Sequence, residues 1–205
     1  MFWEKTKIIK ALNSEYLSIK PFCKHCIKSY SYILRLGKTW NHIPQGQPLA
    51  EEIDVFDLSL FRSKVKTNLA SSILIKSFSF ILNASCEVVR LPSNVMGIML
   101  PLGQITRLGF VNFSSPFLHP GFGGDTGLPI VFEFYHILPY SIRLYAGMPF
   151  AHLHFLSVTP SRDSHDSPAR TYLDNNFLGS IYDQLEAYQM ATEEFRGDSQ
   201  TALSE

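Results

Sequence analysis

The fold of this 205-residue chain is decided by Leu91–Phe155, which reads LPSNVMGIMLPLGQITRLGFVNFSSPFLHPGFGGDTGLPIVFEFYHILPYSIRLYAGMPFAHLHF. Short apolar and aromatic runs alternate there with Pro and Gly residues, which mark turns. The runs are rich in Val, Ile, Phe and Tyr and have the length of strands. Similar runs precede this stretch at intervals of roughly ten residues, which favours a β-sandwich or barrel over alternating strands and helices.

One acidic residue, Glu133, stands inside the apolar run Ile130–Tyr135. A carboxylate flanked by large apolar residues is costly to bury unless it is paired or used in chemistry. The nearest comparable cation is Arg107, in the run Thr106–Gly109. From the residues alone, a structural ion pair and a functional carboxylate are equally open interpretations of Glu133.

Elements outside this stretch follow from periodicity and turn residues. An amphipathic helix is predicted within residues 3–17 and a second one within residues 181–196. The other predicted segments are a strand from Ser29 that turns at Gly37, a loop over Asn41–Leu49, an edge strand over Glu51–Leu58, strands at Ile73–Ile75, Phe78–Leu82 and Cys86–Leu91, a loop over residues 159–170 and a tail from Gly197.

Composition narrows the class of protein. The 18 basic and 18 acidic residues give a net charge of zero, so nothing in the composition favours a nucleic-acid or membrane partner. No apolar run reaches the ~18 residues of a membrane helix. Three cysteines and an N-terminus without the order of a secretory signal predict a reducing compartment, the cytoplasm.

Two short motifs could bind a metal, but each lacks ligands. Cys23 and Cys26 form a CxxC without the second ligand pair of a tetrahedral zinc site. His152 and His154 share one face of a predicted strand, with no evident third ligand. The signature of zinc deaminases, His-x-Glu followed by Pro-Cys-x-x-Cys, is absent. We therefore predict no metal site, and treat a redox role of the CxxC as the less favoured interpretation.

The ordered motifs of Leu91–Phe155 resemble the deoxycytidine triphosphate deaminase family of the trimeric dUTPase superfamily. The motifs are, in order, Leu91-Pro92, Thr106–Gly109, His119–Gly124, Phe132–Phe134, Pro139–Met148 and Leu153–Phe155. Two earlier phrases, Leu17–Phe22 and Ile33–Gly37, also match the family in position.

The resemblance implies a mainly β protein, with a distorted β-barrel or jelly-roll-like fold of the dUTPase type and short N- and C-terminal helices. It implies one domain over residues 1–205, with an N-terminal helix region (1–20), a β core (21–158) and a C-terminal lid and tail (159–205). It also implies a homotrimer with sites between subunits. The reaction would be zinc-independent hydrolysis of dCTP to dUTP and ammonia, with Mg²⁺ carried on the triphosphate.

By the same resemblance, Glu133 is the general acid and base, and Arg107 assists near the reacting ring. The predicted substrate-binding residues are Gly103, Gln104, Ser115, His119, Arg170 and Tyr172.

The departures from the family fall on the residues that hold the substrate. Leu102 and Gly103 stand where the family has a phosphate-binding Arg and a Ser, so a charge-assisted contact is lost. His119 replaces an Asp, and Thr171 replaces the lid Lys, although Arg170 is adjacent. An alternative is therefore a catalytically impaired member that acts as a nucleotide-binding or structural oligomer. A dUTP pyrophosphatase is weaker, because the Gly-rich C-terminal arm of that family is missing.

Overall fold

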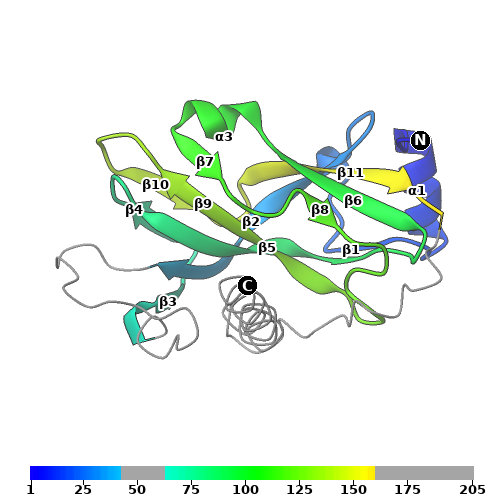
Figure 1. Cartoon of the computed structure of the whole chain (residues 1–205), viewed down its shortest axis with the longest axis horizontal. Coiled ribbons are helices and arrows are strands. Elements are labelled where there is room, and N and C mark those ends of the chain that lie inside the picture. The colour runs from blue at the N-terminus through cyan, green and yellow to red at the C-terminus, as the bar shows by residue number, and fades with distance from the viewer. Residues whose placement is uncertain (43–62, 160–205) are drawn as a thin grey trace, which may run out of the picture. The chain divides into compact units, whose positions relative to one another are not determined.

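The structure, a computed structural model, describes residues 1–42 and 63–159 (Figure 1). By internal contacts, residues 1–42 and 65–159 belong to one unit, and residues 63 and 64 to another. All elements below lie in the first unit. The predicted edge strand Glu51–Leu58 and the whole of the predicted C-terminal lid, helix and tail fall outside the described residues. A single domain over residues 1–205 stays a prediction.

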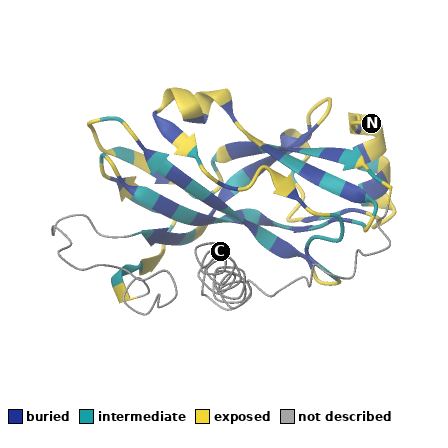
Figure 2. Ribbon diagram, in the orientation of Figure 1, coloured by how far each residue is buried: buried dark blue, intermediate teal, exposed yellow. Residues whose placement is uncertain are grey.

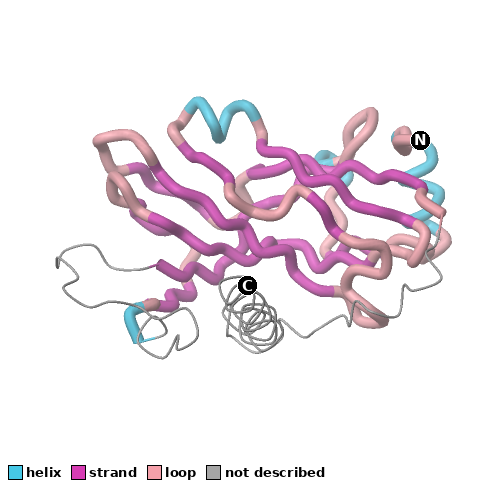
Figure 3. The backbone as a smooth tube through the Cα atoms, viewed as in Figure 1, coloured by secondary structure: helices cyan, strands magenta, loops and turns pink. Residues whose placement is uncertain are grey.

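Strands are the main regular secondary structure of the described chain, with few helical turns (Figure 3). In chain order the elements are α1 (Lys5–Asn13), β1 (Ser18–Lys20), the 3₁₀ turn η1 (Lys24–Cys26), β2 (Tyr32–His42), β3 (Lys66–Leu69), β4 (Ser72–Ile75), β5 (Phe80–Arg90), β6 (Val95–Pro101), α3 (Gly103–Arg107), β7 (Phe110–Asn112), β8 (Phe117–Leu118), β9 (Leu128–His136), β10 (Ile142–Tyr145) and β11 (Pro149–Ser157). The predicted N-terminal helix is thus confirmed as α1.

A curled antiparallel sheet has the strand order β7-β9-β5-β2-β11-β6-β8. Off this path, β1 pairs with β5 and β3 with β2, while β4 and β10 form a two-stranded sheet of their own. Strand β2 connects the part of the sheet with β5 and β9 to the part with β11 and β6. The mainly β prediction is confirmed.

The core lies on one face of β5 and β9, because both strands alternate buried and half-buried residues along their whole length (Figure 2). The buried face of β9 carries Phe132 and Phe134, whose ring centroids lie 4.7 and 4.8 Å from that of Phe150 on β11. Aromatic pairs of this kind add about 0.5–1.5 kcal/mol beyond their buried area. The alternation leaves the next residue, Glu133, on the opposite face.

Strand β5 is longer than the sequence predicts. It runs unbroken from Phe80 to Arg90, so the prediction of two strands, Phe78–Leu82 and Cys86–Leu91, is wrong. The polar segment between them does not turn, because Asn83 is fully buried and bonded across the sheet. Its amide oxygen accepts the Gly37 N–H at 3.0 Å, and its amide nitrogen donates to the carbonyl oxygens of Gly37 at 3.2 Å and Thr39 at 2.9 Å.

The same bonds correct the prediction of a turn at Gly37. Strand β2 continues through Gly37 to His42, so Asn41 and His42 are strand residues, not the start of a loop. Its register with β5 shifts between Leu36 and Trp40, which is where Gly37 lies. A glycine inside a strand often marks such a bulge or a close backbone approach.

Replacing Gly37 by Ala should lower the free energy of unfolding by about 1–3 kcal/mol, the usual cost of overpacking. A Cβ at this position would collide with the carbonyl oxygen of Ala84, and backbone cannot move aside as a side chain can. Urea unfolding of Gly37→Ala measures the loss. Gly103→Ala is the matched control, since a Cβ there meets no atom within 4 Å. Equal stabilities of the two variants would contradict the close approach.

Candidate functional site

Glu133 lies in the middle of β9, between two phenylalanines of the core. Directly opposite it on β5 is Leu82, and residues paired in this way project from the same face. Glu133 is half-buried, and burial raises the pKa of its carboxyl group above the ordinary value. Within residues 1–42 and 63–159 no hydrogen bond or ion pair reaches the carboxylate. A carboxyl group of this kind suits proton transfer near neutral pH.

The segment after β7 fixes the backbone of Glu133. The Glu133 N–H donates to Ser114 Oγ at 2.7 Å, and the Ser114 hydroxyl donates to Asn112 Oδ1 at 2.7 Å. In return, the N–H of Phe113 donates to the Glu133 carbonyl oxygen at 2.7 Å. Sequence reasoning missed Ser114 and Asn112, and the only sequence signal for them is the Asn-x-Ser spacing, which is typical of local side-chain hydrogen bonding.

Two aromatic rings lie on the face of the sheet that carries Glu133. Phe80 is paired with Tyr135, two residues along β9 from Glu133, and therefore shares its face. The ring of Phe113 lies 6.4 Å from that of Phe80 and is 58% exposed. The two rings are tilted by 42° to each other, and the exposed ring of Phe113 is of the kind on which a nucleobase stacks.

Arg107 is not brought to Glu133 within one chain. It ends α3, a helix where the resemblance implies a loop and strand, and its side chain is exposed. The β7–β9 ladder begins at the α3 end with Phe110 opposite His136, and Phe113 bonds to Glu133 at the other end. In the described part of the chain no ion pair links the two. The catalytic roles of Glu133 and Arg107 stay predictions.

The predicted substrate-binding residues lie in three places. Gly103 and Gln104 are exposed on α3, and His119 is exposed just after β8. Ser115 is exposed in the loop before β8, where its hydroxyl donates to the Phe117 carbonyl oxygen at 3.3 Å rather than to the strand of Glu133. Arg170 and Tyr172 lie outside the described residues.

Comparison with known proteins places the chain. A model of the family described as "dCTP deaminase-like" matches residues 2–158. The chain belongs to this family. The "dCTP deaminase, dUMP-forming" of Methanoregula boonei is 27% identical over 161 residues, which cover 78% of this chain and 84% of that protein. The protein of the same name from Tropheryma whipplei is 24% identical, over 82% of this chain and 84% of its own length.

A solved structure of the 2'-deoxycytidine 5'-triphosphate deaminase from Agrobacterium tumefaciens superposes with a TM-score of 0.57 at 12% identity. The match covers 75% of this chain but 47% of that one, so this chain spans about half the length of that protein. At this identity the likeness shows the fold. It confirms the dUTPase-type fold that the motifs predict.

Leu102 lies at the start of α3 in this dCTP deaminase-like chain, and the sequence resemblance implies that it replaces a phosphate-binding Arg. It is 8% exposed, and its N–H donates to the Phe150 carbonyl oxygen at 3.1 Å. Position 102 therefore contributes to the core and presents no group to a phosphate. Gly103 and Gln104, which follow it, carry the exposed polar groups of this turn.

His152 and His154, the two histidines on β11 of this deaminase-like domain, have structural partners. His152 Nδ1 shares a hydrogen bond with Ser31 Oγ at 2.9 Å, and His154 Nδ1 lies 2.9 Å from the Tyr30 carbonyl oxygen. Residues 1–42 and 63–159 contain no group of three or more His, Cys, Asp or Glu placed to bind a metal. No helix in the same residues is long and apolar enough to cross a membrane.

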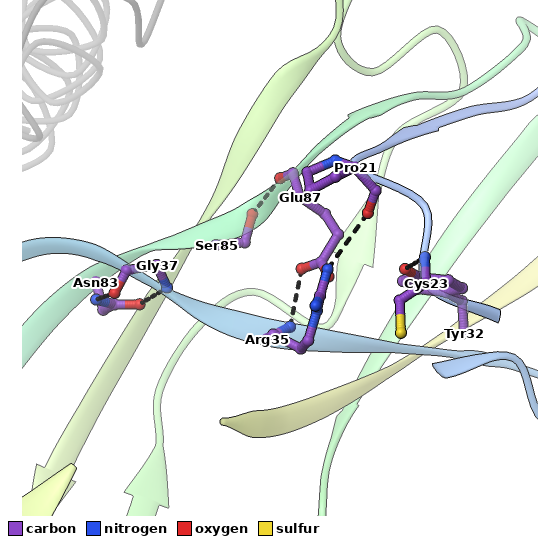
Figure 4. Close-up of polar contacts among 8 residues, drawn as sticks. All are labelled: Pro21, Cys23, Tyr32, Arg35, Gly37, Asn83, Ser85 and Glu87. Atoms are coloured by element: carbon purple, nitrogen blue, oxygen red, sulfur yellow. Dashed lines mark hydrogen bonds and ion pairs between the residues drawn. The ribbon is translucent and has the colours of Figure 1, made fainter. Parts of the chain in front are cut away.

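A second carboxylate, Glu87 on β5, is fully buried and paired with Arg35 on β2 (Figure 4). Arg35 Nε lies 2.6 Å from Glu87 Oε1, and the Arg35 N–H donates to Oε2 at 2.9 Å. Burial alone would lower the pKa of Arg35, but the hydrogen bond and the charge of Glu87 outweigh it and raise the pKa. This pair is structural, and sequence reasoning did not find it.

Proposed function

We propose that this protein deaminates dCTP by hydrolysis, with Glu133 as the group that carries protons. The observation that supports this most is the half-buried carboxyl group of Glu133, which has a raised pKa and no partner among the described residues. Glu87, in the same sheet, contrasts with Glu133, because its carboxylate is buried and paired with Arg35. An unpaired acid in an apolar strand is costly, and a catalytic role accounts for its presence.

In this reaction the carboxyl group of Glu133 transfers protons from water to the cytosine base. Water adds to C4 of cytosine as the Glu133 carboxylate accepts its proton. Glu133 gives this proton to N3, which leaves a hydroxyl and an amino group on C4. It then takes the proton of the C4 hydroxyl and passes it to the amino group, so that the C4–N bond breaks, ammonia leaves and C4 becomes a carbonyl. The exposed ring of Phe113 would hold the base against the sheet. The substrate enters as the magnesium complex of dCTP, and no zinc is needed in this scheme.

We further propose dUMP as the uracil nucleotide that is released. The sequence resemblance by itself implies dUTP, but the curated relatives at 24–27% identity are named for forming dUMP. Release of dUMP adds hydrolysis of the bond between the α- and β-phosphates to the deamination, with pyrophosphate as the second product. Chromatography of the products separates dUMP from dUTP.

We propose that the site is completed by a neighbouring copy in a homotrimer. Among residues 1–42 and 63–159, Glu133 and Arg107 form no ion pair, so the arginine near the ring would come from another copy. Exposed apolar side chains recur on the segment that carries α3, β7 and β8, and contact with another chain would bury them. They are Leu100, Leu108, Val111, Phe113 and Phe117.

Light scattering of the purified protein should give three chain masses at micromolar concentration. If the site is shared, mixing an Arg107→Ala chain with a Glu133→Gln chain, each inactive alone, should restore part of the activity through mixed trimers. A monomeric mass would contradict the shared site, and so would mixed trimers that stay inactive.

The buried Leu102 favours a second candidate, a family member that binds the nucleotide without turning it over. A protein that keeps Glu133 but lacks the phosphate-binding Arg loses substrate affinity and position together. This candidate has the same fold as an active deaminase, and an assay of dCTP turnover distinguishes the two.

The test is incubation of the purified full chain with magnesium and dCTP, followed by measurement of ammonia and of uracil nucleotides. Deamination predicts equal amounts of both. Binding of dCTP by calorimetry without turnover would support the second candidate. Turnover of dUTP in the absence of any dCTP turnover would identify a pyrophosphatase and overturn the proposal.

A further inference from the structure

The CxxC motif lies in the connection between β1 and β2. Cys23 precedes the 3₁₀ turn η1 and Cys26 ends it, with the Cys26 N–H donating to the Cys23 carbonyl oxygen at 3.0 Å. A four-residue turn closed in this way holds its end Cα atoms within about 7 Å of each other. Disulfides join Cα atoms about 4.4–6.8 Å apart. The backbone therefore already has the shape that a Cys23–Cys26 disulfide requires.

The two thiols differ in exposure and in hydrogen bonding. Cys26 is 7% exposed, whereas Cys23 is half-buried. Hydrogen bonding from Cys26 and from the backbone of residues 25 and 26 lowers the pKa of Cys23. Burial, and after it hydrogen bonding to Cys23, raises the pKa of Cys26 to about 11. These properties fit Cys23 as the nucleophilic thiolate and Cys26 as the protonated, resolving cysteine.

Surrounding groups hold this arrangement in place (Figure 4). The Cys23 N–H donates to the hydroxyl of the buried Tyr32 at 2.9 Å. The Arg35 guanidinium, which is paired with Glu87, donates to the Pro21 carbonyl oxygen at 3.3 Å, two residues before Cys23. Its positive charge favours the thiolate of Cys23, and it also favours the thiolate of Cys26. The segment before the CxxC is therefore connected through Arg35 to the ion pair with Glu87.

We propose that Cys23 and Cys26 form a redox-active dithiol that exchanges with low-molecular-weight disulfides. The Cys23 thiolate attacks one sulfur of the external disulfide, whose S–S bond breaks and releases one thiolate. The Cys26 thiol then gives up its proton, and its sulfur attacks Cys23 in the mixed disulfide. The second external thiolate leaves, so two electrons pass from the two cysteines to the external disulfide. This proposal does not depend on the nucleotide chemistry.

The third cysteine of the chain, Cys86 on β5, provides an internal control. It is half-buried like Cys23, but it lies within strand β5 and has no neighbour in a CxxC. If exposure alone governed oxidation, Cys86 and Cys23 would react alike. The proposal predicts that they do not.

The experiment uses the full chain, reduced and then equilibrated in glutathione buffers of varied thiol-to-disulfide ratio. Acid quenching and alkylation trap the thiols, and mass spectrometry of the intact chain and its peptides locates them. We expect a form that has lost two hydrogen atoms, carries no glutathione and maps to the peptide with Cys23 and Cys26, while Cys86 is alkylated. A stable glutathione adduct in the unmodified protein, or a disulfide that includes Cys86, would overturn the proposal.

Single substitutions test the order of the two steps. Cys26→Ser should stop the reaction at a glutathione adduct on Cys23, Cys23→Ser should slow oxidation at least tenfold, and Cys86→Ser should leave it unchanged. Unaltered oxidation of Cys23→Ser would contradict the assignment. Alkylation of the unmodified protein needs no substitution: iodoacetamide at neutral pH should modify Cys23 before Cys26, and the reverse order would also contradict it.

Discussion

Replacing Glu133 by Gln should lower kcat for dCTP deamination by about 10²–10⁴-fold, the usual contribution of a general acid and base. The amide keeps the shape and hydrogen-bonding capacity of the side chain, but it cannot accept a proton from water or return one to the base. Since the backbone of Glu133 is held by Ser114 and Phe113, the substitution should not move β9. Substrate affinity is therefore expected to change much less than kcat. Ammonia release under saturating dCTP measures the effect.

The control for this substitution is Glu4→Gln. Glu4 is exposed ahead of α1 and makes no capping hydrogen bond, so the same chemical change there should leave the rate unaltered. A Glu133→Gln protein with the wild-type rate would remove Glu133 from the mechanism.

The Glu133→Gln variant should also differ from the wild type in stability at neutral pH. Burial raises the pKa of Glu133, so the folded protein binds its proton more tightly than the unfolded chain does. As pH rises from the ordinary glutamate pKa of about 4.3 to the higher folded value, unfolding becomes more favourable. The Glu133→Gln protein lacks this loss. It should be more stable than the wild type at pH 7 and equally stable near pH 4, which urea unfolding at both pH values tests.

Replacing Arg35 by Met should reduce the free energy of unfolding by about 3–5 kcal/mol, because the fully buried Glu87 carboxylate is left without its partner. Proteins of this kind have about 5–15 kcal/mol of stability in total, so the variant is expected to unfold at a much lower urea concentration. Two bonds are lost at once, since Arg35 Nε contacts Glu87 and Nη2 donates to the Pro21 carbonyl oxygen. Urea unfolding monitored by tryptophan fluorescence measures the change.

A double variant separates the ion pair from the volume of its side chains. Arg35→Met combined with Glu87→Leu removes both charges and keeps an apolar filling, so it should recover much of the stability that the single variant loses. An Arg35→Met protein that loses less than about 1 kcal/mol, the value of an exposed ion pair, would contradict an ion pair whose carboxylate is fully buried.

The half-buried Glu133 and the buried Glu87 show how far the sequence can be interpreted. Glu133 and Glu87 both stand in apolar strands, and the sequence signal for the two is the same in kind. What distinguishes them is a partner: Arg35 is 52 residues from Glu87 in the chain and reaches it only because β2 pairs with β5. Sequence periodicity predicts strands, but it does not state which strands pair. The unpaired acid could be singled out, whereas the paired one could not.

Local polarity misled the prediction of β5 in a similar way. Asn83, Ala84 and Ser85 have the composition of a turn, but two of them hold hydrogen bonds across the sheet that exist only after folding. Asn83 bonds to Gly37, and Ser85 Oγ accepts the N–H of Ile130 at 2.8 Å. The same limit applies to Ser114, whose bond to the Glu133 N–H depends on the pairing of β7 with β9.

The central claim, hydrolytic deamination of dCTP, is tested most directly by running the reaction in water enriched in heavy oxygen. Hydrolysis at C4 places one oxygen atom from water in the uracil base, which mass spectrometry of the isolated base detects separately from any label in the phosphates. We predict uracil nucleotide with one heavy oxygen in its base and an equal amount of ammonia. If dCTP is recovered unchanged after prolonged incubation with an equimolar amount of folded protein, the claim is contradicted.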